Sequence, residues 1–263
     1  MITRKFSLCI SCIAFANITL MAGADAAVLA ARSLTVGIAA SNAPRYSGSD
    51  KRQFNFAPVI DARDGAFFFN SQDGLGYDLQ SDSGLYLEHT LGYSLGRSDK
   101  NSSWRDGSKK LRGMGNIDAV MNTAVAVGWT IVPWLSVEGK ATLPLTDSQG
   151  VQYQTSVSLI PFQDESDTLV FQSAALFGDS RYMNTFYGVS DRQHIRSGYR
   201  RYSTTGGLYG VQNSLTWGHR FTPQWGTMLE AGYTWLSHRT DKSPIVFRRN
   251  EATVTAAVTY TFD

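Results

Sequence analysis

The stretch EATVTAAVTYTF, residues 251–262, decides the fold. Apolar residues occupy every even position from Ala252 to Phe262, whereas Glu or Thr occupies every odd position except Ala257. A period of two places these sets on opposite faces of a β-strand. One face is apolar and ends in aromatic rings, and the other is polar. This pattern is typical of a strand that separates lipid from a wet lumen.

The same alternation recurs along the chain in segments of about 10–15 residues, longer than the ~5–6 residues of soluble strands. A tilted membrane strand needs about 9–11 residues. A soluble β-sandwich is the alternative, but it would show shorter strands. We therefore predict an all-β protein, a transmembrane antiparallel up-and-down β-barrel of about 12 strands (range about 10–14).

The sheet must close on itself, because unpaired backbone groups in lipid are very costly. An even number of strands places both termini on the periplasmic side. The predicted strands lie near 33–41, 53–62, 65–71, 75–81, 84–97, 118–132, 134–145, 149–162, 168–179, 207–222, 224–237 and 248–262.

The N-terminus predicts export. Arg4 and Lys5 precede a mostly apolar stretch, and Ala24-Asp25-Ala26 supplies the small residues of a cleavage site. We expect residues 1–26 to be a signal peptide and 27–263 to be a single outer-membrane barrel domain. Both cysteines lie in the predicted signal, so no disulfide is expected. The formal net charge of +2 shows no nucleic-acid footprint.

Turn chemistry suggests the up–down sense of the strands. The tight turns Thr222-Pro223-Gln224 and Val132-Pro133-Trp134 are predicted to be periplasmic. An alternative remains, because RYMNTFYGV (181–189) could be a further strand, which would invert the upstream topology and make 98–117 periplasmic. Otherwise the segments predicted to face outward are 42–52, 98–117, 180–206 and 238–247.

No catalytic constellation is found in the sequence. The four histidines are scattered without metal-ligand spacing, and no nucleophile elbow or phosphate loop is present. Ser214 and His219 have an odd spacing that puts them on opposite faces of one strand. We expect no enzyme activity, no metal and no cofactor.

Five charged residues are predicted to point into the lumen: Glu88, Glu138, Lys140, Arg220 and Glu230. They could line a path for ions or solutes, or form salt bridges that brace a narrow lumen. We favour bracing, because about 12 strands lies between small filled barrels and open porins. The basic segment 194–201 could meet lipopolysaccharide phosphates or be an ordinary solvated loop.

Six ordered motifs resemble the MipA/OmpV family, also called MltA-interacting proteins. They are APRYSGS (43–49), PVI with GAFF (58–60 and 65–68), YSLGR (93–97), LRGMGNID (111–118), RYM with YGV (181–183 and 187–189) and SPI (243–245). The match spans most of residues 27–263. Asp263 departs from the usual aromatic end of such barrels.

The resemblance implies an outer-membrane barrel that scaffolds a murein transglycosylase and a murein synthase. A narrow porin-like channel and a surface adhesin are the alternatives, and no catalytic residues are implied. The motif residues are candidates for partner contact or for turn structure: Pro44, Tyr46, Gly48, Ser49, Arg97, Leu111, Gly113, Gly115, Asp118, Tyr182, Met183, Gly188, Val189, Ser243 and Pro244.

Overall fold

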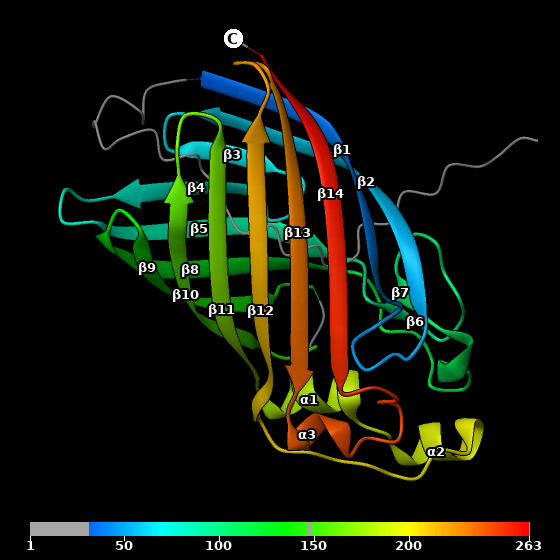
Figure 1. Cartoon of the computed structure of the whole chain (residues 1–263). Helices are drawn as coiled ribbons and strands as arrows, with labels where there is room; N and C mark the ends of the chain where they lie inside the picture. Colours follow the sequence, from blue (N-terminus) through cyan, green and yellow to red (C-terminus); the bar gives the residue numbers. More distant parts are fainter. Residues whose placement is uncertain (1–31, 147–148, 263) are drawn as a thin grey trace, which may run out of the picture.

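The computed structural model describes residues 32–146 and 149–262, in which twelve antiparallel strands close into a barrel (Figure 1). Each of the twelve predicted strands overlaps one of them, so the predicted fold is confirmed. Around the barrel the strands are β1 (Arg32–Pro44), β14 (Asn250–Phe262), β13 (Trp225–Leu236), β12 (Gly207–Arg220), β11 (Asp167–Gly178), β10 (Gln152–Gln163), β9 (Leu135–Pro144), β8 (Val120–Val132), β5 (Leu85–Ser94), β4 (Gly74–Gln80), β3 (Phe67–Asn70) and β2 (Arg52–Asp64).

The first and last strands close the barrel. β1 pairs with β14 from Leu34, opposite Phe262, to Asn42, opposite Val254. The predicted signal peptide and Asp263 lie outside the described residues. None of the helices in the described part of the chain is long and apolar enough to cross a membrane.

The two faces of the wall follow the period-two pattern. Outward side chains are apolar and exposed, including Phe54 at 76%, Ile38 at 60% and Val254 at 54%. Inward Thr216 and Thr255 are fully buried. An exposed apolar belt of this kind matches the hydrocarbon layer that a membrane strand must face.

β3 and β4 are much shorter than their neighbours. β3 pairs with β2 only from Asp61 to Asp64, and the chain then turns back at 71–73. The hairpin therefore fills only one half of the height of the wall, the half where β1 begins and β14 ends.

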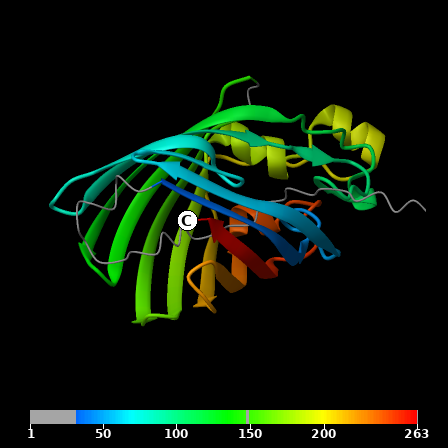
Figure 2. The same ribbon diagram turned by 90° about the horizontal axis from the view of Figure 1, so that it is seen from above.

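The remaining elements gather at the end of the barrel opposite the C-terminus (Figures 1 and 2). They come from the connections that follow β5, β11 and β13. They are β6 (Arg97–Ser98), β7 (Asp106–Gly107), η2 (Lys109–Leu111), α1 (Ser180–Tyr187), α2 (Asp191–Ser197) and α3 (His238–Asp241).

The alternative of a strand at 181–189 is wrong, because Ser180–Tyr187 forms the helix α1. The Asp179 side chain caps this helix by accepting a hydrogen bond from the Tyr182 N–H. The upstream topology is therefore not inverted. Segment 98–117 lies at the same end of the barrel as the other long connections.

Candidate functional site

The described residues of five connections, 45–51, 95–119, 145–146 with 149–151, 179–206 and 237–249, form what we call the cap. Its first apolar cluster joins four of them. Buried Tyr46 donates its hydroxyl hydrogen to the carbonyl of Ile245 at 2.8 Å. Leu111, Met114, Val189 and Ile245 complete the cluster. The segments predicted from separate motifs therefore pack into one body.

Arg97 lies beside this cluster and is 5% exposed. Its Nη1 donates to the carbonyl of Phe186 at 2.6 Å, and its guanidinium lies 5.6 Å from the Tyr46 ring centre. Loss of hydration on burial lowers the pKa of Arg97, and the nearby groups Tyr46 and Tyr187 oppose this shift. The side chain thus links the connection after β5 to α1.

A second apolar cluster seats α1 on the inner wall of the barrel. Met183 and Tyr187 of α1 are buried against Ala174 and Leu176 of β11 and Tyr209 of β12. The Ser243 hydroxyl donates to the carbonyl of Tyr187 at 2.6 Å, next to Pro244. This contact ties the connection that contains α3 to α1.

Gly48 is placed where a side chain would not fit. Its φ is +97°, and an added Cβ would lie 2.8 Å from Val246 Cγ2. Its N–H donates to the Glu251 carboxylate, and its carbonyl accepts from the Phe247 N–H at 2.7 Å. The neighbouring Pro44 ends β1, and Ser49 is buried.

Gly113 of LRGMGNID serves close packing in the same way. Gly113 has a φ of +87°, and an added Cβ would lie 2.6 Å from the Arg196 carbonyl oxygen. Gly115 also has a positive φ. Gly188 ends α1, and Val189 pairs with Tyr202. The motif residues of the cap are therefore brought together, and partner contact by any of them stays a prediction.

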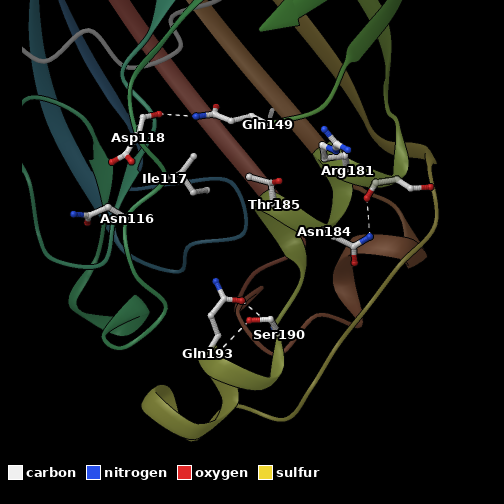
Figure 3. Close-up of a pocket in the computed structure, with 10 residues that line it drawn as sticks. Asn116, Ile117, Asp118, Gln149, Arg181, Asn184, Thr185, Ser190 and Gln193 are labelled. Atoms are coloured by element: carbon white, nitrogen blue, oxygen red, sulfur yellow. Dashed lines mark hydrogen bonds between the residues drawn. The ribbon is translucent and has the colours of Figure 1, made fainter. Parts of the chain in front are cut away.

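A pocket of about 620 Å³ opens between the connection after β5 and helices α1 and α2 (Figure 3). Gln149 donates to the Asp118 carbonyl at 2.7 Å, and Gln193 and Ser190 cap α2 with reciprocal hydrogen bonds. Hydroxyl and amide groups dominate the lining, which could hold a small polar solute. It comprises Asn116, Ile117, Asp118, Gln149, Ser180, Arg181, Asn184, Thr185, Ser190 and Gln193.

Inside the barrel, the charges form contacts across strands. The Lys140 ammonium lies 2.9 Å from Asp73, and the Tyr86 hydroxyl donates to Glu138 at 2.9 Å. Glu230 accepts from the Thr216 hydroxyl at 3.4 Å. Glu88 is opposite Asp78 in the register of β4 and β5. Only the bond between Glu230 and Thr216 joins neighbouring strands. The Lys140–Asp73 pair runs from β9 to the β3–β4 turn, and the Tyr86–Glu138 bond runs from β5 to β9, so both pass intervening strands on the inside of the barrel. That these charges brace the lumen stays a prediction.

Arg220 is placed differently from the other predicted lumen residues. It is exposed at the end of β12 and donates to the carbonyl of Glu165 in the turn after β10. Sequence reasoning also missed Arg63 and its ion pair with Asp78 at 2.7 Å. Arg63 is separated from Gln53 by an even number of residues in β2, so the period of two could have predicted that both side chains point into the lumen.

The cap carries most of the positive charge. Its described residues include 17 of the 24 Lys and Arg residues but only 7 of the 22 Asp and Glu residues. The wall and the short turns are correspondingly acidic. The segregation is a property of the folded chain, because the overall net charge is only +2.

No group of three His, Asp or Glu side chains in the described ranges could hold a metal ion. Ser214 is buried on the inner face, whereas His219 contacts Asp167 at 2.9 Å and stacks with Trp217. The two residues do not form a nucleophile–base pair.

A family model described as "MltA-interacting protein MipA" matches residues 36–262. No curated protein matches the sequence. Among solved structures, an outer membrane channel from Pseudomonas putida F1 aligns with a TM-score of 0.51 at 11% identity, covering 89% of this chain and 96% of that chain. A KdgM porin aligns with a TM-score of 0.45 at 9% identity, covering 87% and 99%.

Proposed function

The chain belongs to the MltA-interacting protein MipA family, and we propose that it is a non-catalytic outer-membrane scaffold for a murein transglycosylase and a murein synthase. The family name supplies the partner class, and the exposed acidic side chains of Asp82 and Glu165 on the rim of short turns are the observation that carries the proposal. The cap, held by two buried clusters and a buried arginine, is a fixed structure at the opposite end of the barrel and does not form the proposed partner surface.

The proposed orientation places the cap outside the cell and both termini in the periplasm, after removal of residues 1–26 from the barrel domain 27–263. The excess of Lys and Arg in the cap supports it, since guanidinium forks match the phosphates of lipopolysaccharide. Exposed Arg192 and Arg196 of α2 are candidates for such contacts.

The orientation is tested by labelling. Ser102→Cys, at a half-buried position of the cap between the exposed Asn101 and Ser103, should react with an impermeant maleimide on intact cells. Labelling only after the outer membrane is opened would place the cap in the periplasm and would overturn the orientation.

Under this orientation the periplasmic partner meets the rim of short turns. Asp82, in the turn after β4, and Glu165, in the turn after β10, are exposed there. Neither side chain makes a hydrogen bond or an ion pair with the described residues, so both can be changed with little effect on folding. An acidic rim would attract a basic surface on the partner.

Pulldown from solubilised membranes tests the scaffold. The wild-type barrel should retain a murein transglycosylase, and the double variant Asp82→Lys/Glu165→Lys should lose most of it. The matched cap variant Arg192→Glu/Arg196→Glu should retain it. Failure of the wild-type barrel to retain any murein enzyme would refute the scaffold.

A narrow pore is the second candidate function. Most inward side chains of β9 and β10 are only half-buried, including Glu138, Lys140 and Gln154. This part of the wall therefore faces water. Conductance steps in planar bilayers, with cation preference increased by Lys140→Glu, would support a pore, and the absence of steps would exclude it.

A further inference from the structure

The wall of the barrel is interrupted between β2 and β5. Past the β3–β4 hairpin, residues 52–59 of β2 pair only with β1, and residues 92–94 of β5 pair only with β8. We call the stretch between these two edges the seam. In Figure 1, β3 is a short arrow while β2 continues toward β6 and β7.

Backbone groups of β2 point into the seam. The Ile60 carbonyl accepts from the Ser71 N–H at 2.9 Å, and its N–H donates to the Ser71 hydroxyl at 3.0 Å, so both groups face away from β1. Along an antiparallel strand, the N–H and carbonyl groups of successive residues point alternately to the two sides. The backbone groups of Phe54 and Phe56 therefore point to the same side as those of Ile60, away from β1. Neither has a backbone partner there among the described residues.

The seam is bounded on all sides. The hairpin turn closes it at Ile60, and the connection after β5 crosses to the turn after β1, where the Gly107 N–H donates to the Arg45 carbonyl at 2.9 Å. Two intervening strands set the edges about 14 Å apart at the hairpin. The loss of strand pairing is therefore confined to this stretch and does not run through the full height of the wall.

The two sides of the seam differ in polarity. Outward Phe54 and Phe56 are 76% and 56% exposed. Inward Asn55 is 2% exposed, and neither of its amide atoms has a hydrogen-bond partner. The Nε2 of Gln53 and the hydroxyl of Ser41, which faces Asn55 in the register, also lack partners. At the seam, β2 thus has exposed apolar side chains on its outward face and buried polar side chains without partners on its inward face.

A docked protein strand fits the seam poorly. Pro58 lacks an N–H at a position whose backbone faces the seam, which interrupts a ladder, and proline on an open edge is a common guard against strand pairing. Unpaired groups in lipid nevertheless require a polar partner. A polar head group can satisfy them while its chain lies against Phe54 and Phe56.

We propose that the seam is a lateral portal through which an amphiphile with an acyl chain and a non-acidic polar head passes between the membrane and the lumen. The head-group charge follows from the lumen beside the hairpin, where acidic residues outnumber basic ones. The acidic residues are Asp61, Asp73, Asp78, Glu88 and Glu138, and the basic ones are Arg63 and Lys140.

Fluorescence quenching tests the portal. Cys9 and Cys12 are first replaced by Ser, and bimane is attached to Asn55→Cys or to the matched control Thr255→Cys. Ser41 faces both positions in the register, and Thr255 is inward and fully buried in a strand paired on both sides. Chain-brominated phosphatidylcholine should quench the Asn55→Cys label about threefold more, because a closed wall excludes lipid. Equal quenching at the two positions overturns the portal.

Crosslinking tests the ligand. A photoactivatable lysophosphatidylcholine in vesicles should label the peptide that contains residues 53–60, and unlabelled lysophosphatidylcholine should compete. A fatty acid, with its acidic head, should compete poorly. Absence of crosslinking, or equal competition by the fatty acid, overturns the proposed ligand class. Heat-modifiable electrophoretic mobility checks that each variant is folded.

Discussion

The wall from β12 to β1 and the cap are held together by different forces. β12 and β13 pair without a register shift from Gly210 to Arg220, and their outward side chains meet lipid. In the cap, buried side chains such as Arg97 and Tyr187 make the connections instead. The wall is therefore one cooperative hydrogen-bonded unit, whereas the cap should open locally with its own free energy.

The largest effect is expected from a charge on the lipid face of the wall. Val254→Arg should lower the free energy of unfolding by about 2–4 kcal/mol if the site lies near the bilayer midplane. Thr253→Arg, whose position is inward and half-buried, is the matched control and should cost less. Urea unfolding in vesicles measures both. Equal losses would contradict the assigned faces.

The cap should respond to loss of its buried arginine without loss of the wall. Arg97→Ala removes a charged hydrogen bond to the Phe186 carbonyl, which should weaken the closed cap by about 2 kcal/mol. Limited proteolysis of segment 95–119 should become faster, while the urea midpoint of the barrel stays unchanged. A comparable shift in that midpoint would show that cap and wall form one unit.

A smaller effect separates close packing from backbone strain. Gly113→Ala places a Cβ 2.6 Å from the Arg196 carbonyl oxygen and forces a side chain to a φ of +87°. Gly198→Ala meets the same kind of φ, +78°, with no atom within 4 Å. Strain at positive φ costs about 1–3 kcal/mol, so Gly113→Ala should open the cap more readily than Gly198→Ala in the proteolysis assay. The reverse order would contradict the packing.

The smallest effect is a pH dependence of the cap. The hydrogen bond from Lys110, at 2.7 Å, lowers the pKa of Asp50. Because this pKa is lower in the folded state, the pair stabilises the cap above the unfolded pKa of about 3.9, and the contribution is lost as pH falls through the folded value. A partly exposed pair contributes at most about 1 kcal/mol. Proteolysis between pH 6 and pH 3 should show the loss in wild type but not in Asp50→Asn.

The sequence alone was sufficient for the wall. A strand with lipid on one face and water on the other must alternate, so the pattern from Ala252 to Phe262 fixes both the strand and its faces. The same reasoning recovered even the short strands near 65–71 and 75–81. Motifs such as APRYSGS and LRGMGNID indicated the family, which the match over residues 36–262 confirms.

Tertiary structure decided the rest, because non-local contacts leave no local period. The sequence RYMNTFYGV (181–189) could be read as a strand or as a loop. The structure shows a helix there, because Asp179 caps α1 and Met183 is buried against β11. The gathering of Tyr46, Leu111 and Ile245 into one cluster joins positions up to 199 residues apart. The seam likewise depends on where the β3–β4 hairpin turns relative to β2, a register that strand alternation by itself does not specify.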